Sequence, residues 1–249
     1  MRTQIKTQDE IAAMRTSGKI LAEILQLLKQ ATRVGMATQE LDHMAREELK
    51  KRGAKAAFLG YQDFPAALCI SINDEIAHGI PGDYVLQDGD LVHLDLGVSY
   101  EGMITDAGIG YVLGEATDDQ QRLLIGTEKA LMAGIVMVKE GARTGDIGAA
   151  IEKTLDKYRL DVVYELGGHG VGHTVHEDPF VGNYGTPGTG ESLRAGMTIA
   201  IEPNVSLAGH EMYLKNNGWT WCTKTGALAV QFEHTVLVTE DGYEILTQV

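Results

Sequence analysis

The chain has 249 residues, of which 44% are hydrophobic, so it is long enough to bury the core of one large domain or two small ones. Its net charge of −14 argues against non-specific nucleic-acid binding, which needs a basic surface. It has neither a long uninterrupted apolar stretch nor an apolar N-terminal signal region, so we expect no membrane span and no secretory signal. The distant cysteines Cys69 and Cys222 favour reduced thiols in a cytoplasmic protein.

Two helices are predicted at the start of the chain. Thr7 and Glu10 have the spacing of a capping box, and an apolar stripe with helical periodicity follows them to about position 34. A second helix is expected over 38–53 and a loop with several aromatic residues over 54–67. A short strand is then expected over 68–73, before a turn at His78-Gly79-Ile80-Pro81.

Residues 89–113 are predicted to form a two-stranded hairpin. Side chains alternate along a strand, so Leu91, His93 and Asp95 share one face while Val92, Leu94 and Leu96 share the other. If Tyr100 and Glu101 form the tip, Asp95 lies directly opposite Asp106. Two such carboxylates repel each other, so they are either solvated or offset by a cation, a proton or an arginine.

The second half of the chain repeats this order of elements. Helices are predicted over 117–140 and 144–158, a short extended segment over 162–166, and a functional loop rich in glycine and histidine over 167–190. Strands are expected over 197–201, 219–223 and 229–238.

A faint internal repeat supports two related halves. The segment that begins at Gly35 recurs at Gly141, each time between two helices. Each half then reads as two helices followed by two strands that carry carboxylates. We therefore expect an α+β fold, a single catalytic domain 1–249 with pseudo-symmetric halves at about 7–113 and 117–240. Such halves would bring together four carboxylates, Asp95, Asp106, Glu202 and Glu233.

These four carboxylates and His169 are the candidate metal ligands. Four negative charges would be neutralised by two divalent cations, and oxygen ligands with one imidazole suit Mn²⁺, Fe²⁺, Co²⁺ or Zn²⁺. A shared carboxylate can bridge two metals about 3.5–4 Å apart. Structural zinc is disfavoured because the chain has no Cys-x-x-Cys pair.

Three histidines lie in the glycine-rich segment. His169 and His176 are interpreted as functional, because the surrounding glycines allow close backbone approach, and His173 as structural. His78 is a further candidate that could donate a hydrogen bond to a substrate carbonyl. Glu177, together with Asp178, Asp88 and Asp90, is interpreted as solvated or capping.

Taken in order, these residues resemble the type 1 methionine aminopeptidases, relatives of prolidase, aminopeptidase P and creatinase. The resemblance covers nearly the whole chain. Its motifs are His78-Gly79-Ile80-Pro81, Gly168-His169-Gly170-Val171-Gly172, His176-Glu177-Asp178-Pro179, Ile201-Glu202-Pro203 and Glu233-His234-Thr235. The short interval between His169 and Glu202 leaves no room for the insert of the type 2 enzymes.

The resemblance implies a pita-bread fold with two divalent metal ions, Co, Mn, Fe or Zn. It implies removal of the N-terminal methionine from nascent proteins whose second residue is small, through attack by a metal-activated hydroxide. Carried over by position, Asp95 would chelate one metal and His169 and Glu202 the other, while Asp106 and Glu233 bridge both.

The resemblance also implies catalytic and substrate-binding roles. Glu202 would carry a proton from the water to the leaving amine. His78 and His176 would bind the scissile peptide and stabilise the oxyanion. A pocket for the methionine side chain would be lined by Tyr61, Phe64, Cys69, Val175 and Trp219.

Three positions depart from the family pattern. Gly97 and Ala107 stand where threonine is common, so two hydroxyls that could support the ligands are lost, and weaker metal binding is expected. Val175 replaces an aromatic residue and is expected to enlarge the pocket or shift its preference.

Two other functions compete with this interpretation. One is an X-Pro dipeptidase or aminopeptidase of the same fold, and the other is a non-catalytic binding protein that keeps the fold. The expected partners are peptides with N-terminal methionine and nascent chains, with transient ribosome association. We expect a cytoplasmic monomer that binds no membrane and no specific nucleic acid. The physiological metal stays open.

Overall fold

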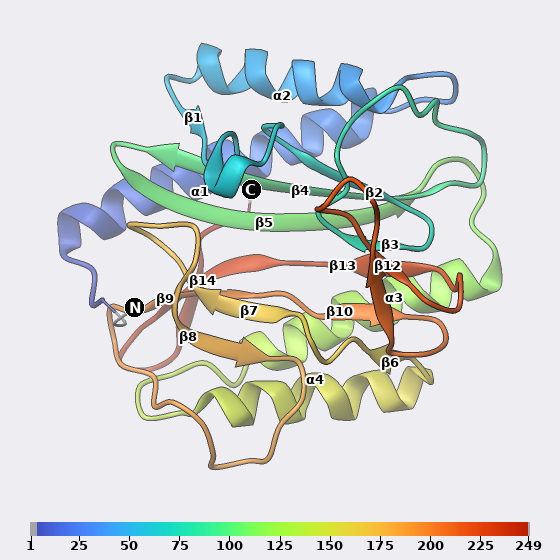
Figure 1. The fold of residues 1–249 in the computed structure, drawn as a ribbon. Coiled ribbons are helices and arrows are strands. Elements are labelled where there is room, and N and C mark those ends of the chain that lie inside the picture. The colour runs from blue at the N-terminus through green and yellow to red at the C-terminus, as the bar shows by residue number, and fades with distance from the viewer. Residues whose placement is uncertain (1–3, 249) are drawn as a thin grey trace.

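Two helices at the start of the chain cover one face of a long hairpin (Figure 1). The computed structural model describes residues 4–248, so the ends of the predicted domain, residues 1–3 and 249, lie outside the described residues. Helix α1 spans Gln8–Ala31 and α2 spans Thr38–Lys51. The predicted capping box is confirmed, because the hydroxyl of Thr7 accepts from the N–H of Glu10 and the carboxylate of Glu10 accepts from the N–H of Thr7.

Glu10 makes the stability of the N-terminus of α1 depend on pH. Its hydrogen bond from the N–H of Thr7 and its contact with His173 hold the pKa of the carboxyl down to about 2. The stabilisation is therefore complete above the unfolded-state pKa of about 4.5 and disappears as the pH falls towards 2. For Glu10→Gln we expect a loss of about 1 kcal/mol of unfolding free energy at pH 7, since the side chain is partly exposed. Urea denaturation at pH 7 and near pH 2 checks this, and an equal loss at both would contradict it.

The hairpin consists of β4, Leu91–Tyr100, and β5, Met103–Val112. Its predicted register is wrong by two residues, because Asp95 pairs with Gly108 and Gly97 pairs with Asp106. The tip is Glu101-Gly102, whose φ angles are 50° and 84°, and two-residue turns with both angles positive suit the twist of a hairpin. Asp95 and Asp106 are thus diagonal neighbours on the same face of the sheet.

The opposite face of the hairpin packs on the helices. Val92, Leu94 and Leu96 are fully buried in one cluster with the apolar stripe of α1. At roughly 1.5–3 kcal/mol for each large side chain buried, this packing holds the strands against the helix and leaves the aspartate face turned towards the second half of the chain.

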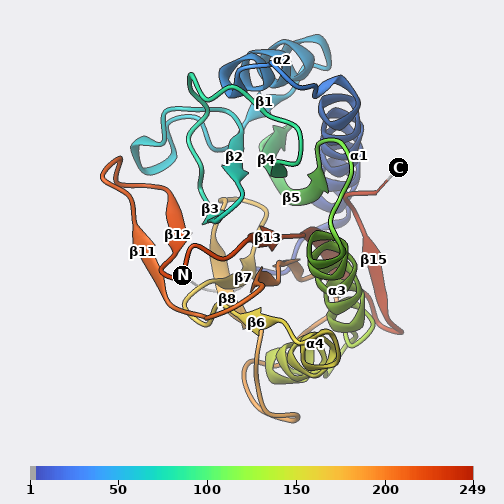
Figure 2. The same ribbon diagram turned by 90° about the vertical axis from the view of Figure 1, so that its right-hand side faces the viewer.

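Helices α3, Asp118–Ile135, and α4, Thr144–Tyr158, cover the second half, so strands lie between two helical layers (Figure 2). The prediction for α4 is confirmed. Helix α3 ends before position 140, because the N–H groups of Met137 and Val138 bond to Gly134 and Ile135 in a tighter turn.

The second half contributes a five-stranded sheet in the order β15-β14-β9-β7-β8. These strands are Tyr243–Ile245, His234–Val238, Thr198–Ile201, Gly167–Gly170 and Glu177–Gly182. The continuous loop predicted over 167–190 is therefore wrong. A Cβ atom on Gly168 would overlap the carbonyl of Ala200, so glycine here permits close packing of strands.

The strand predicted over 229–238 is interrupted. It divides into β13, Ala229–Gln231, and β14. At the interruption, the N–H of Glu233 donates to the carbonyl of Gly108 at 3.0 Å. This bridge joins the two halves and brings Glu233 beside the aspartate face of the hairpin.

The remaining elements are short. They are β1 (Lys55–Ala56), η1 (Tyr61–Asp63), β2 (Cys69–Ile72), β3 (Glu75–Ala77), β6 (Asp161–Val162), β10 (Asn204–Ser206), β11 (Met212–Leu214) and β12 (Trp221–Thr223). Within residues 4–248, no helix has the length and apolar character needed to cross a membrane.

Candidate active site

The two halves bring all five predicted metal ligands to one buried place. Asp95 and Asp106 come from β4 and β5. His169 lies on β7, Glu202 directly follows β9, and Glu233 stands between β13 and β14. Asp106, His169 and Glu233 each offer a ligand atom within 4.8 Å of the others.

The ring of His169 is oriented for ligation. Its Nδ1 lies 2.9 Å from the carbonyl of Gly170, so an Nδ1–H donates there and Nε2 faces the carboxylates. That Nε2 lies 3.4 Å from Oε1 of Glu202. Burial lowers the pKa of His169 to about 3, which leaves the ring neutral, the form that binds a metal.

Burial raises the pKa values of the four carboxyl groups, and repulsion between them adds to this effect. Burial raises the pKa of Asp106 to about 7 and that of Glu202 to about 8. The pKa values of Asp95 and Glu233 also rise well above their usual range, first through burial and then through the charge of Asp106. The four carboxyl groups therefore cannot all be ionised near pH 7 unless a cation offsets their charge.

The donor set fits a divalent cation. Oδ1 of Asp95, Oδ1 of Asp106 and Oε1 of Glu233 are buried and lack a hydrogen-bond partner among the described residues. A buried carboxylate oxygen without a partner is costly, and a cation would offset that cost. Hard oxygens with one neutral imidazole match the ligand preference of Mn²⁺, Fe²⁺, Co²⁺ and Zn²⁺.

Two amides that sequence reasoning missed support the cluster. Nε2 of Gln231 donates to Oε2 of Glu202 and to Oε2 of Glu233, each at 3.0 Å. Nδ2 of Asn204 also donates to Oε2 of Glu202 at 3.0 Å. In the sequence, Gln231 lies two positions before Glu233 in a predicted strand, so both were expected on one face, and this could have placed Gln231 at the site. No sequence pattern marked Asn204.

A cavity of about 620 Å³ opens beside the cluster. Its lining includes every residue predicted to bind substrate: Tyr61, Phe64, Cys69, His78, Val175, His176 and Trp219. Phe58 and Gln62 also line it and were not predicted. Both lie in the aromatic segment that includes Tyr61 and Phe64, so their position in that segment could have predicted that they line the cavity.

Phe58 explains the glycine at position 97. A Cβ atom on Gly97 would lie 2.5 Å from the ring of Phe58, so a larger residue there would displace that ring. Phe58 and Val175 belong to the same apolar cluster and both line the cavity, so Phe58 supplies aromatic surface to a pocket that has valine at position 175. The backbone of Asp106, next to Ala107, is held by Thr235, whose hydroxyl accepts from its N–H at 2.8 Å. The effect of Gly97 and Ala107 on metal affinity stays a prediction.

Two further histidines flank the cluster. The ring of His176 lies 4.3 Å from that of His169, and its Nδ1 is 2.9 Å from the hydroxyl of Tyr61. His78 has a positive φ of 57° and its ring lies 6.4 Å from that of Trp219. Burial lowers the pKa of His78 to about 4 and also lowers that of His176. Both rings are therefore neutral near pH 7, and each can donate one hydrogen bond into the cavity.

Comparisons with known proteins agree with this geometry. Residues 12–240 match the model of metallopeptidase family M24. The chain is 42% identical to the methionine aminopeptidase of Clostridium perfringens over 243 residues, 98% of each protein. The crystal structure of methionine aminopeptidase from Thermotoga maritima matches with a TM-score of 0.98 and 40% identity over all of both chains.

A more distant match concerns the fold alone. The crystal structure of the prolidase from Pyrococcus horikoshii matches with a TM-score of 0.78 and 24% identity, covering 98% of this chain and 63% of that one. With the family match, it confirms the predicted α+β pita-bread fold.

Proposed function

Because the chain belongs to metallopeptidase family M24 and to its methionine aminopeptidases, we propose that it removes the N-terminal methionine from peptides and proteins whose second residue is small. The observation that carries this proposal is the buried cluster of carboxylates and His169, which lines a cavity together with several aromatic side chains. The cavity suits a thioether, since Phe64, Cys69 and Trp219 offer aromatic and polarizable surface.

We assign the cluster to two divalent ions, Co, Mn, Fe or Zn. Asp95 would hold one ion, His169 and Glu202 the other, and Asp106 and Glu233 both. Such ions supply Lewis acidity, which makes a water more acidic and the scissile carbonyl more electrophilic. The unpartnered oxygens of Asp95, Asp106 and Glu233 support this assignment.

Glu202 moves the proton in this proposal. Its Oε2 is held by Asn204 and Gln231, so Oε1 is the atom that faces the reacting groups. Oε1 accepts a proton from the attacking water and returns it to the leaving amine. The two amide donors keep the carboxyl from rotating away between the two transfers.

His176 and His78 bind the scissile peptide. The hydroxyl of Tyr61 donates to Nδ1 of His176, which leaves Nε2–H to donate to the oxygen that gains charge during the attack. His78, which also lines the cavity, donates a further hydrogen bond to the peptide. A neighbouring cavity of about 720 Å³ shares both histidines with the first and continues along Phe180, so we assign it to the rest of the substrate chain.

A peptide panel tests this function. Purified protein is expected to release free methionine from Met-Ala-Ser when supplied with Mn²⁺, Fe²⁺, Co²⁺ or Zn²⁺, and to stop when EDTA removes the metal. Leu-Ala-Ser and Xaa-Pro dipeptides serve as matched alternatives. Faster cleavage of Xaa-Pro would identify an X-Pro peptidase, and no turnover with any metal would favour a non-catalytic binding protein.

The setting of this activity follows from the same proposal. We expect a cytoplasmic monomer, with the whole chain as one catalytic domain, that acts on nascent chains and associates transiently with the ribosome. The net charge of −14 gives no support to specific nucleic-acid binding or to attachment to an anionic membrane.

A further inference from the structure

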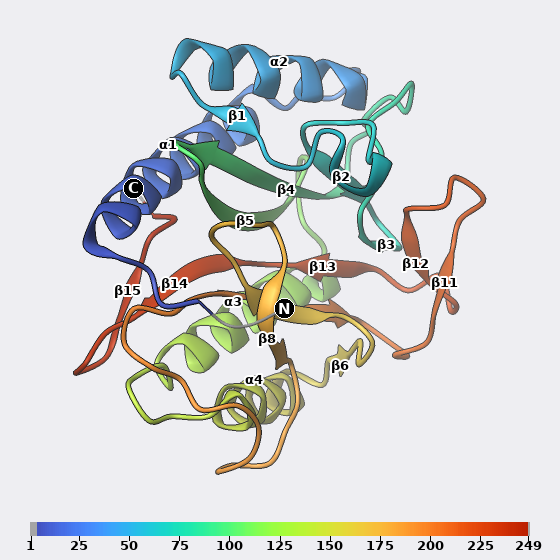
Figure 3. The same ribbon diagram turned by 60° about the vertical axis from the view of Figure 1, so that its left-hand side comes forward.

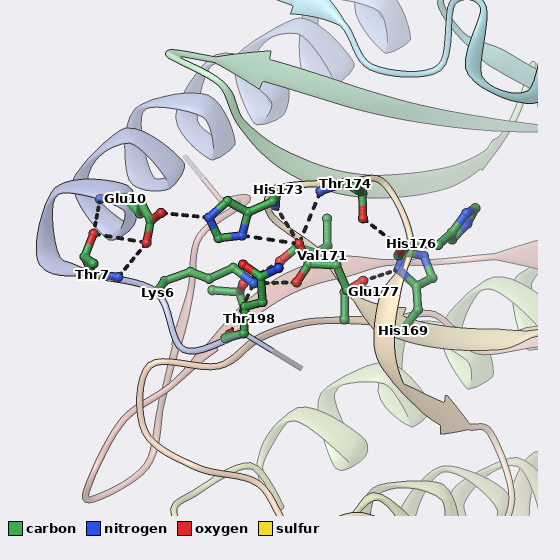
Figure 4. Close-up of polar contacts among 12 residues, drawn as sticks. Lys6, Thr7, Glu10, His169, Val171, His173, Thr174, His176, Glu177 and Thr198 are labelled. Carbon is green, nitrogen blue, oxygen red and sulfur yellow. Dashed lines mark hydrogen bonds and ion pairs between the residues drawn. The ribbon is translucent and has the colours of Figure 1, made fainter. Parts of the chain in front are cut away.

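The segment before α1 is tied to the loop that carries His176. This loop, residues 171–176, connects β7 to β8 and rises towards β5 (Figure 3). Nζ of Lys6 lies 2.6 Å from Oε2 of Glu177, the residue that follows His176 (Figure 4). The side chain of Lys6 is 0% exposed and that of Glu177 is 4% exposed. Of the two roles expected for Glu177, solvated or capping, burial leaves only the second.

The carboxylate of Glu177 joins two structures at once. While Oε2 pairs with Lys6, Oε1 accepts hydrogen bonds from the N–H groups of His173, at 2.6 Å, and Thr174, at 3.2 Å. The backbone of the His176 loop is thus folded around one carboxylate. A buried charge of this kind needs a partner, and Lys6 supplies it.

A second contact runs between the same two segments. Nε2 of His173 lies 2.7 Å from Oε1 of Glu10, whose other oxygen serves the capping box of α1. The packing leaves no spare room, because a Cβ atom on Gly172 would overlap the stem of Lys6. The carbonyl of Gly172 also accepts from the N–H of Ile104 on β5 at 2.7 Å.

These contacts fix the residues on both sides of His176. Glu177 holds the backbone at positions 173 and 174, and the hydroxyl of Thr174 donates to the carbonyl of His176 at 2.8 Å. We propose that Lys6 and Glu177 are positioning residues that set the His176 ring against the substrate oxygen. This inference rests on the proposed function, because it assigns the N-terminal segment a part in the same reaction.

An ion pair elsewhere in the chain provides a matched control. Arg15 of α1 pairs with Glu244 of β15 at 2.7 Å, and their side chains are 48% and 37% exposed. Like Lys6, Arg15 joins the N-terminal part of the chain to a distant strand, but among the described residues its side-chain hydrogen bonds go to Glu244 and not to the His176 loop. Exposed pairs of this kind contribute little to stability.

The test compares Lys6→Met with Arg15→Met in the metal-loaded protein. Removing Lys6 leaves the charge of Glu177 buried without its partner, so the loop is expected to shift. A misplacement of about 1 Å can lower the rate roughly 10²-fold. We expect kcat for Met-Ala-Ser to fall about 10–100-fold in Lys6→Met, with KM changed less than about 3-fold. The reason is that the hydrogen bond from His176 to the substrate oxygen, which the shifted loop weakens, acts in the transition state. Arg15→Met is expected to keep the kcat of the wild type.

A double variant separates positioning from simple loss of stability. In Lys6→Met/Glu177→Gln the amide oxygen still accepts from His173 and Thr174, and no buried charge is left unpaired. We expect its kcat to exceed that of Lys6→Met by about 5-fold or more, with thermal unfolding measured for each variant. Wild-type kcat in a folded Lys6→Met, or equal losses in Lys6→Met and Arg15→Met, would overturn the inference. Absence of turnover in the wild type would instead overturn the proposed function, and this inference with it.

Discussion

Replacing Glu202 with Gln is expected to lower kcat for Met-Ala-Ser by roughly 10³-fold while the protein stays folded. The amide has nearly the shape of the carboxyl, and its oxygen can still accept from Asn204 and Gln231. Its nitrogen would then occupy the place of Oε1, where it can neither accept a proton nor return one. The loss should therefore appear in kcat, and the circular dichroism spectrum should not change.

Metal content distinguishes two reasons for that loss. Glu202 is proposed both as a ligand and as the proton carrier, so bound metal is measured beside the rate. Glu211→Gln makes the same chemical change at an exposed side chain, 64% accessible, and should keep full activity. A Glu202→Gln protein with the wild-type rate would refute the acid–base role. A protein that regains the wild-type rate at high metal concentration would reduce Glu202 to a ligand alone.

The aspartate hairpin shows how far sequence reasoning reaches. Alternation along a strand is a local property, so the common face of Asp95 and Asp106 could be predicted. The register could not, because it depends on which residues adopt positive φ at the tip, and Glu101 does so beside Gly102. The register error was two residues, which preserves the face, and the site prediction survived it.

Other features depend on contacts between distant segments. The interruption at Glu233 arises from its bridge to Gly108, and the strands at Gly168 and Gly170 arise from close backbone packing. The same glycines predict a loop when only the local pattern is read. The pairing of Lys6 with Glu177 leaves no trace in periodicity, since 171 positions separate the two residues.

For Asp106, a substitution is expected to lower activity and yet to raise the stability of the metal-free protein. Asp106→Asn is expected to abolish measurable turnover, a loss of at least about 10³-fold, yet to stabilise the metal-free protein. Burial raises the pKa values of Asp95, Glu202 and Glu233, and the charge of Asp106 raises them further, so an ionised Asp106 repels the charged form of each in the absence of a cation. The neutral amide removes that repulsion, whereas most substitutions in a buried site destabilise.

Thermal unfolding at pH 8 measures both effects. In EDTA, the melting temperature of Asp106→Asn should exceed that of the wild type by about 2–4 °C, which corresponds to about 1 kcal/mol in a chain of this size. Saturating Mn²⁺ should raise the wild-type melting temperature and leave that of the variant nearly unchanged.

Asp42→Asn is the matched substitution with the opposite expectation. The carboxylate of Asp42 is already satisfied by the N–H groups of Ala67 and Leu68, at 2.8 and 3.1 Å, and by Arg46. Removing its charge therefore weakens existing bonds and should lower the melting temperature in EDTA and in Mn²⁺ alike. If Asp106→Asn also destabilised the metal-free protein, the carboxylates would not be in conflict without a cation. The buried cluster would then have to be held by the protein alone, which would contradict its assignment as a metal site.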